Sequence, residues 1–419
     1  MTRVNGVNLI GHAYAEIGLG EDLRMVARSL LGANIPFKVI NIPLVNDLRE
    51  GNLFLKPWET PLDQSPFKTS IFCLTPDKQE AFLLQNNDNF FQGQYLIGAW
   101  PWELYRWPTE MNHYLSTVDE LWANSRHIEK AWTTCSHPAK PPIHWLPAAA
   151  EAPSQSPFNS EKAARKHFGI PEAKFVLICA FDLLSGYQRK NPLGAVKAFK
   201  QAFDTAGFNA QDDACLILKT HSLRSFLGPW ENLKQEVAND PRIQIIETTY
   251  PADQSIELLR CCNGLLSLHR AEGFGRIIAE SMILGLDIIA TAYSGNSDYM
   301  QGENVYPISY RLGPVGRINS LLDSEMQIWA EPDLENAAFQ IGASYQKYRG
   351  RGGMNSIRPW PSFCPMAQAK LSAREAGKRY KKRLNQIWSE LRQQANQGPI
   401  APARRADLSH GPHCLPPIA

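Results

Sequence analysis

Short apolar segments alternate with amphipathic ones along most of the chain, and this alternation limits the possible folds more than any other feature. The apolar segments are about four to eight residues long, and they include VNLIG, FKVINI, TSIFCL, QYLIGAW, KFVLICAFD, CLILKT, RIQIIE, GLLSLHR and DIIAT. Segments of this kind, separated by helical stretches, are typical of parallel sheets that helices cover on both faces. The pattern therefore predicts an α/β protein with doubly wound sheets.

The length of the chain predicts two domains. Its 419 residues exceed the roughly 250 to 300 residues at which a single hydrophobic core stops growing. A polar, proline-containing segment lies near residues 150–173, and we place the boundary there, between an N-terminal domain over 1–157 and a C-terminal domain over 158–365. A tail over 396–419 is expected to be disordered. Ligands of doubly wound domains bind beyond the carboxyl ends of the strands, so the site is expected in the cleft between the two domains.

Charge, hydropathy and cysteine spacing indicate which partners, location and metal sites to expect. The net charge is +2, which gives no broad basic field for nucleic acid. The sequence shows neither an apolar signal segment nor a run of about 18 apolar residues, so a cytoplasmic location is expected. The eight cysteines are scattered without metal-ligand spacing. His410, His413 and Cys414 lie close together in the tail, but no functional metal is expected there.

A glycine-containing helix is predicted after the first strand. Apolar residues recur at helical spacing from Leu23 to Leu31, and Gly32 stands where the helix is expected to end. Gly18 and Gly20, at the start of this helix, would let the backbone approach a ligand closely. The motif is not GxGxxG, and no acidic residue ends the second strand, so a dinucleotide site is disfavoured.

Two glutamates, Glu272 and Glu280, flank a glycine-rich turn between a predicted buried strand and a predicted helix that Gly285 stops. The first turn of that helix would present free N–H groups near residues 274–277, which is a preformed anion site. The two carboxylates are too far apart to act as one pair, so they would contact different parts of one elongated ligand. The alternative is that Glu272 is a helix-end charge and that Glu280 pairs with Arg276 on the helix surface.

A second cationic element follows an earlier strand that ends at Phe181. An eight-residue loop brings Arg189 and Lys190 to the start of a helix near Pro192. Two adjacent cations at a helix start oppose the helix dipole, so an anion such as a pyrophosphate is expected to hold them there. The alternative is that both side chains are merely solvated.

Several motifs together resemble the retaining GT-B glycosyltransferases of family GT4. SLHRAEGFGRIIAESMILGLDIIATAYSGNSDYM is similar to their C-terminal signature, in which two glutamates have the E-x7-E spacing of Glu272 and Glu280. FDLLSGYQRKNP resembles their diphosphate-binding loop, GLGEDLRMVARSL their glycine-loop helix, and WELYRWP with DELWANS a subgroup pattern. The resemblance covers roughly residues 5–390 and implies a GT-B fold of two Rossmann-like domains facing a central cleft. It also implies a C-terminal helix over 366–395 that packs back on the N-terminal domain.

The resemblance implies roles for individual residues. Glu280 would bind the ribose of a nucleotide-sugar and Glu272 the hydroxyls of the transferred sugar. Lys190 would neutralise the leaving diphosphate. The predicted catalytic residues are Glu272, Lys190 and Arg189, and the predicted donor-binding residues are Glu280, Gly273, Phe274, Gly275, Arg276, Gly18 and Gly20.

This sequence departs from the family pattern at two places. Asp182 and Leu183 replace the Gly-Arg that usually follows the strand, so Arg189 would compensate for the missing arginine. Arg276 stands where leucine is common and would add a contact to phosphate or substrate.

The acceptor is expected on the N-terminal domain. Six of the 11 tryptophans lie between residues 100 and 145, a density that favours aromatic platforms for sugar rings, although tryptophans are usually core. His12 and Glu103 each follow a strand end, where they could position or deprotonate an acceptor hydroxyl. Trp102, Glu103 and His12 are therefore the predicted acceptor residues. His269 is expected to be a hydrogen-bonded histidine at a strand end.

These features favour a retaining, metal-independent glycosyltransferase without a cofactor, acting in polysaccharide biosynthesis. Its donor would be a UDP- or GDP-sugar and its acceptor a glycan or a lipid-linked sugar. Two alternatives stay open: a catalytically silent GT-B protein that binds a glycan or a partner, and a dinucleotide-dependent oxidoreductase. A basic stretch over 376–388 leaves peripheral membrane contact open, although packing of its apolar side in the core is favoured.

Overall fold

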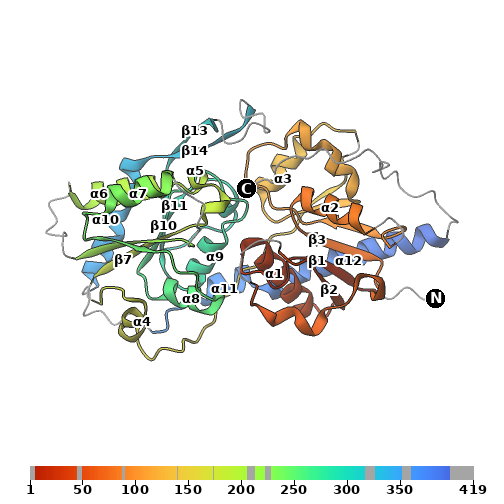
Figure 1. The fold of residues 1–419 in the computed structure, drawn as a ribbon, viewed down its shortest axis with the longest axis horizontal. Helices are drawn as coiled ribbons and strands as arrows, with labels where there is room; N and C mark the ends of the chain where they lie inside the picture. The colour runs from red at the N-terminus through yellow and green to blue at the C-terminus, as the bar shows by residue number, and fades with distance from the viewer. Residues whose placement is uncertain are drawn as a thin grey trace. The chain divides into compact units, whose positions relative to one another are not determined.

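A computed structural model describes residues 5–44, 50–86, 90–138, 140–172, 174–204, 213–221, 228–316, 326–351 and 360–396. The chain divides into two compact units (Figure 1). The N-terminal unit comprises the described residues of Met1–Ala150, Val315–Gln327 and Ala369–Ile418, and the C-terminal unit those of Glu151–Pro314 and Ile328–Gln368. The predicted tail beyond Asn396, with His410, His413 and Cys414, lies outside the described residues.

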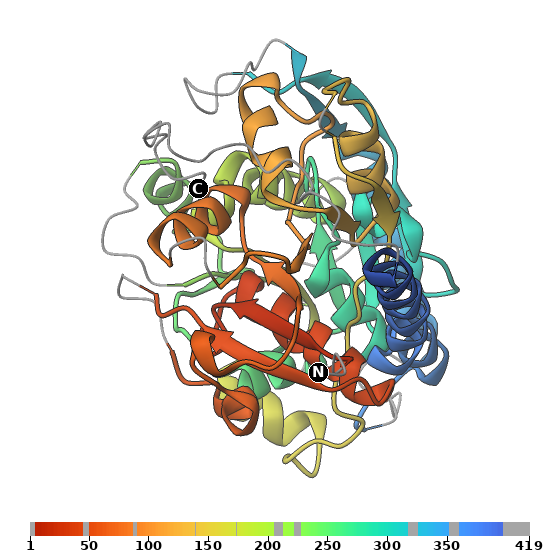
Figure 2. The ribbon, with the colours of Figure 1, turned by 90° about the vertical axis from the view of Figure 1, so that its right-hand side faces the viewer.

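The N-terminal unit contains a six-stranded parallel sheet. Its strands in spatial order are β2 (Phe37–Asn41), β1 (Val7–Gly11), β3 (Thr69–Cys73), β4 (Tyr95–Gly98), β5 (Glu120–Ala123) and β6 (Ile143–Trp145). Figure 2 shows the red and orange strands of this sheet side by side. Strands β1 and β3 are buried along their whole length, because helices cover both faces of a doubly wound sheet. The helices of this unit include α1 (Gly18–Gly32), α2 (Pro76–Gln85) and α3 (Arg126–Thr133).

The last helix, α12 (Ala373–Asn396), packs against α1 in the same unit. A Cβ atom on Gly377 would lie 2.2 Å from the Ser29 carbonyl oxygen, so only glycine allows this approach. The apolar side of α12 is buried in the core of the unit and consists of Tyr380, Leu384, Ile387 and Trp388. Among the described helices, none combines the length and the hydropathy needed to span a bilayer.

The C-terminal unit has a second six-stranded parallel sheet. Its strands in spatial order are β12 (Val305–Ile308), β11 (Asp287–Thr291), β10 (Gly264–Ser267), β7 (Phe175–Ala180), β8 (Ala214–Lys219) and β9 (Ile243–Ile246). A two-stranded antiparallel sheet joins β13 (Tyr310–Pro314) to β14 (Ile328–Pro332). The helices include α4 (Glu161–Phe168), α5 (Tyr187–Lys190), α6 (Pro192–Asp204), α7 (Pro229–Val237), α8 (Ala252–Arg260), α9 (Arg276–Ile283), α10 (Leu334–Gly350) and α11 (Pro365–Leu371). The α/β prediction is therefore confirmed in both units.

Two predicted helix ends differ in outcome. Gly285 follows α9 with φ +72°, and Leu286 N–H donates to the Ser281 carbonyl, so α9 ends as predicted. Helix α1 does end at Gly32, but the left-handed residue beyond the helix end, the position predicted for Gly32, is Asn34, with φ +54°. Gly32 is the last residue of the helix, and a Cβ atom there would come 3.3 Å from Cα of Arg374.

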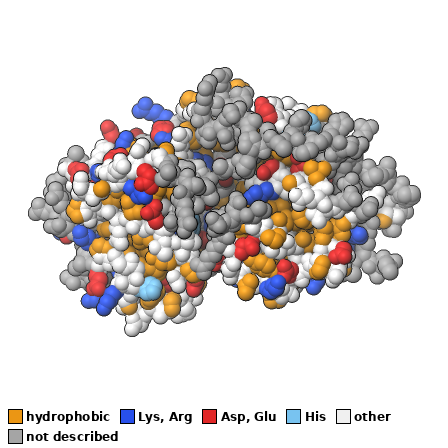
Figure 3. Space-filling model, in the orientation of Figure 1, with side chains coloured by type: hydrophobic (Ala, Val, Ile, Leu, Met, Phe, Trp, Pro, Cys, Tyr) orange, Lys and Arg blue, Asp and Glu red, His pale blue; other side chains and the backbone are white. Residues whose placement is uncertain are grey.

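The surface carries charges of both signs. On the face drawn in Figure 3, Lys, Arg, Asp and Glu side chains are scattered among polar and hydrophobic ones, and the coloured residues of that face form no broad basic field. This distribution agrees with the nearly balanced composition of 43 Lys and Arg against 41 Asp and Glu.

Candidate functional site

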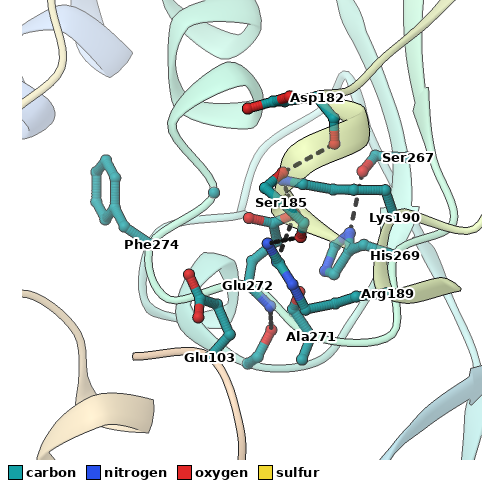
Figure 4. A network of polar contacts seen from close by, with 12 residues as sticks. Glu103, Asp182, Ser185, Arg189, Lys190, Ser267, His269, Ala271, Glu272 and Phe274 are labelled. Carbon is teal, nitrogen blue, oxygen red and sulfur yellow. Dashed lines mark hydrogen bonds and ion pairs between the residues drawn. The ribbon is translucent and has the colours of Figure 1, made fainter. Parts of the chain in front are cut away.

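An ion-paired cluster lies beyond the carboxyl ends of β7 and β10 in the C-terminal unit (Figure 4). Glu272 Oε1 is 2.6 Å from Lys190 Nζ and 3.5 Å from a terminal nitrogen of Arg189. The three side chains are between 11% and 18% exposed, so the cluster is largely, but not wholly, shielded from water. The structure thus brings together the three residues predicted to be catalytic.

The pKa of Glu272 shows how strongly the cations act on it. Burial of the carboxyl by itself raises this pKa, but the charges of Lys190 and Arg189 outweigh burial and lower the pKa from 4.5 to about 2. Glu272 is therefore ionised at neutral pH.

The loop after β7 differs from the predicted eight-residue loop, because it contains the short helix α5. Gly186, with φ +93°, precedes α5, and Asn191 follows it in the left-handed region. Arg189 and Lys190 are the last two residues of α5, and they precede the start of α6 at Pro192, as predicted. Glu272 is their partner in this structure.

Arg189 and Asn191 hold this loop in place. The Arg189 guanidinium donates to the Ala271 carbonyl at 2.8 Å and to the Ser185 carbonyl at 2.6 Å. The Asn191 amide donates to the Leu268 carbonyl at 2.9 Å, while its oxygen accepts from Gly194 N–H at 3.1 Å and so caps α6. The Arg189 guanidinium is thus hydrogen-bonded to backbone carbonyls. The one hydrogen bond of Lys190 Nζ in the described chain is to Glu272.

The turn that carries Glu272 rests on residues 294–299, which the sequence reasoning did not single out. Ser294 Oγ accepts from Glu272 N–H at 2.8 Å, and Gly295 N–H donates to the Glu272 carbonyl at 2.9 Å. The Tyr299 hydroxyl donates to the carbonyl of Phe274 at 2.8 Å. A Cβ atom on Gly295 would come 1.9 Å from a carbonyl oxygen of this turn, so the approach requires glycine.

His269 is fully buried and hydrogen-bonded on both ring nitrogens, as the sequence predicted. Its Nε2 faces Asn296 Oδ1 at 3.0 Å, and the Asn296 amide nitrogen donates to the Thr291 carbonyl. The oxygen of Asn296 must then accept, which assigns the proton to Nε2 and leaves Nδ1 to accept from the Ser267 hydroxyl at 3.0 Å. Burial lowers the pKa of His269, so the ring is neutral next to the ion pair.

Helix α9 begins beside the same turn. Gly275 precedes it with φ +80°. A helix start leaves its first N–H groups without an acceptor in the helix, although Ile278 N–H already donates to the Gly275 carbonyl at 3.0 Å. The Arg276 guanidinium lies 5.8 Å from the centre of the Phe274 ring, and Phe274 points away from the ion pair (Figure 4). Glu280 lies inside α9 and is partly buried. An anion at the start of α9 would meet these N–H groups.

The predicted acceptor residues belong to the N-terminal unit. His12 is 4% exposed, its Nδ1 lies 2.7 Å from the Ile42 carbonyl oxygen, and its Nε2 has no hydrogen-bond partner among the described residues. Burial lowers the pKa of His12. Trp102 is 5% exposed and packs 5.1 Å from Trp107, and the Glu103 carbonyl accepts from His127. The roles of all three stay predictions.

The two glycines of α1 also have distinct surroundings. A Cβ atom on Gly20 would lie 2.2 Å from the Ala15 carbonyl oxygen, so Gly20 permits a close approach between protein backbones. Gly18 has nothing within 4 Å of the Cβ position. Among the described residues, no group of three or more His, Cys, Asp or Glu could hold a metal ion.

Comparisons with solved structures identify the fold. No protein-family model and no curated protein sequence matches this chain. HepE of Anabaena, solved in complex with UDP and glucose, matches with a TM-score of 0.61 and 14% identity over 91% of this chain and 100% of its own. A glycosyltransferase of Rickettsia africae matches with 0.58 and 11% over 92% and 99%. Sucrose-phosphate synthase of Thermosynechococcus elongatus matches with 0.55 and 12% over 94% and 100%.

The chain has the GT-B fold. The predicted resemblance to retaining GT-B glycosyltransferases of the GT4 type is confirmed as a structural one, at low sequence identity. In this GT-B chain, the residues of the ion-paired cluster all belong to the C-terminal unit, and the predicted acceptor residues all belong to the N-terminal unit.

Proposed function

We propose that this protein is a retaining, metal-independent glycosyltransferase, which moves a sugar from a UDP- or GDP-sugar to a glycan or glycolipid-type acceptor. The observation that carries the proposal is the grouping of Lys190, Glu272 and the first turn of α9 at one edge of a parallel sheet. HepE, which has the same fold, was solved with UDP and with UDP-glucose, and this supports a nucleotide-sugar as the donor.

The proposed task of Lys190 is to neutralise the leaving diphosphate. A diphosphate at the start of α9 carries more charge than Glu272, so it would compete for the Lys190 ammonium. An ammonium group and helix N–H groups can stabilise a departing dianion without a metal. Arg189 would contribute its charge from a fixed position, because its hydrogen bonds to Ser185 and Ala271 hold it against the turn.

The proposed task of Glu272 is to bind the transferred sugar. Once Lys190 turns to the diphosphate, the ionised carboxylate can accept hydrogen bonds from sugar hydroxyls and stabilise the positive charge that develops as the glycosidic bond breaks. Glu280 would bind the ribose. The backbone of Gly273, Phe274 and Gly275 would bind sugar and phosphate, and Arg276 would add a contact to the donor.

The acceptor is proposed to bind the N-terminal unit through His12, Trp102 and Glu103. The buried, neutral ring of His12 has an open nitrogen, as the recognition or deprotonation of a hydroxyl requires. Gly18 and Gly20 are proposed to lie near the donor. We also propose a cytoplasmic location, with exposed cations of α12, such as Lys378 and Arg379, available to an anionic membrane surface.

Binding and transfer measurements test this function. Calorimetry with UDP and GDP, followed by transfer assays with UDP-glucose and GDP-mannose, should show nucleotide binding and turnover that persists in EDTA. Lys190→Met should lose binding, whereas Lys197→Met, at an exposed position of α6, should retain it. Turnover that requires added Mg²⁺ or Mn²⁺ would contradict the metal-independent reaction.

A catalytically silent glycan- or partner-binding protein is the second candidate. The observation that favours it is the presence of Asp182 and Leu183 where the related enzymes carry an arginine. Nucleotide binding without transfer or donor hydrolysis, across a panel of nucleotide-sugars, would decide for this candidate.

A further inference from the structure

A buried lysine without an acidic partner lies at the carboxyl end of β8. Lys219 is 8% exposed, and its ammonium group donates to the neighbouring Thr220 carbonyl at 2.8 Å. No carboxylate of the described residues lies within ion-pair distance of its Nζ. Burial of an unpaired ammonium is unfavourable for folding, so its presence here needs a reason beyond stability.

The position of Lys219 relates it to the candidate site. In the sheet, Lys219 pairs with Ala180, the last residue of β7, and the loop that carries Arg189 and Lys190 follows that strand. The carboxyl ends of parallel strands meet at one edge of the sheet, which is where ligands of this class of fold bind. Lys219 therefore lies at the ligand-binding edge, and only β7 separates its strand from β10, which the glutamate-bearing turn follows.

Other groups surround the ammonium. His221 lies two residues further along, close enough for the charge of Lys219 to act on it, and its Nδ1 lies 3.4 Å from Thr249 Oγ1. The Tyr250 ring centre is 5.6 Å from Lys219 Nζ. The charged groups that act on His221 are Lys219 and Asp182. Burial lowers the pKa of Lys219 to about 8 and also lowers that of His221.

We propose that Lys219 and His221 form an oxyanion subsite, which binds a phosphate group at the carboxyl end of β8. The Lys219 ammonium supplies the charge and two hydrogen-bond donors that the Thr220 carbonyl does not use. His221 supplies a further donor when it is protonated. The inference rests on the proposed function for its choice of nucleotide probe. The phosphate is either the diphosphate of the donor or a separate phosphate monoester.

Substitution of Lys219 separates a binding role from a structural one. Lys219→Met removes a buried charge that has no acidic partner, so the ligand-free variant should have a higher melting temperature than the wild type. The same variant should bind UDP at least tenfold more weakly if the donor diphosphate occupies the subsite. If a separate phosphate occupies it, UDP affinity is unchanged and inorganic phosphate no longer binds to the UDP-saturated protein. Lys197→Met is the matched control and should change neither affinity.

The result that overturns the subsite is wild-type affinity of Lys219→Met for both UDP and inorganic phosphate. A lower melting temperature together with those affinities would assign Lys219 a structural role through Thr220. If UDP binding depends on Lys190 but not on Lys219, and phosphate binding does not depend on Lys219 either, the subsite fails and the proposed function stands. If wild-type protein binds inorganic phosphate through Lys219 but binds neither UDP nor GDP, the proposed function fails and the subsite stands.

Proton uptake gives a test that does not require the methionine variant to fold. Calorimetry of the wild type with UDP or inorganic phosphate is run at pH 8 in two buffers of different ionisation enthalpy. It should show proton uptake on binding, because a bound anion favours the charged form of Lys219. Lys219→Arg should bind without this uptake, since arginine is protonated already. The lowered pKa of His221 keeps its own proton uptake small at pH 8, so uptake of unchanged size in Lys219→Arg would contradict the role of Lys219.

Discussion

Glu272→Gln removes the carboxylate charge from the ion-paired cluster and nearly preserves the shape of the side chain. Lys190 and Arg189 lower the pKa of Glu272 from 4.5 to about 2 in the folded protein. By linkage, this difference corresponds to about 3 kcal/mol of folding free energy. Because the folded pKa is the lower one, the contribution is present above about pH 5 and is lost as the pH falls toward 2.

The assay is denaturant unfolding of the wild type and Glu272→Gln at pH 7 and at pH 3. The wild type should be more stable by about 2 to 3 kcal/mol at pH 7, and the difference should shrink at pH 3, where the unfolded carboxyl is protonated. Glu335→Gln, in the first turn of α10, is a control for the loss of one charge in the same unit. A difference of equal size at both pH values would refute the reasoning, because it would then arise from packing and not from the ion pair.

Three further substitutions test other parts of the structure. Glu280→Ala should weaken UDP binding by about 1 to 3 kcal/mol in calorimetry, and the ribose assignment is wrong if the affinity does not change. Gly295→Ala should lower stability by roughly 1 to 3 kcal/mol and reduce turnover, because its methyl group would displace the glutamate-bearing turn; normal stability and activity would contradict this. Arg383→Met should cost about 3 kcal/mol in denaturant unfolding, because Glu120 is fully buried and 2.6 Å from Arg383. Lys382→Met, an exposed change on the same helix, should have little effect, and equal losses in both variants would exclude the buried pair as the cause.

The fold could be predicted because the sequence pattern that indicates it is local. Strands that are buried on both faces read as short runs of Val, Ile and Leu, and this pattern needs no knowledge of distant contacts. The end of α9 at Gly285 was predictable for the same reason. The left-handed residue beyond α1 was not, because it is Asn34 and not a glycine, and Gly32 lies close to Arg374 from the far end of the chain.

The candidate site could be predicted only in part. Spacing and glycine content placed Glu272 before a helix, and the adjacent cations Arg189 and Lys190 marked the other loop. The pairing of Lys190 with Glu272 spans 82 residues, so no local pattern shows it. The support of the turn by residues 294–299 depends in the same way on tertiary contacts.

The burial of α12 in the N-terminal unit has a consequence for synthesis of the protein. Glu120, on β5, has its guanidinium partner 263 residues later, on α12. A ribosome produces the residues of the C-terminal unit between these two, so that unit can fold first, while the N-terminal one still exposes the apolar surface that Leu384 and Ile387 will cover. The N-terminal unit is therefore the first to be synthesised and the last to complete its folding. Truncation of the chain before α12 should leave this unit prone to aggregation or dependent on chaperones.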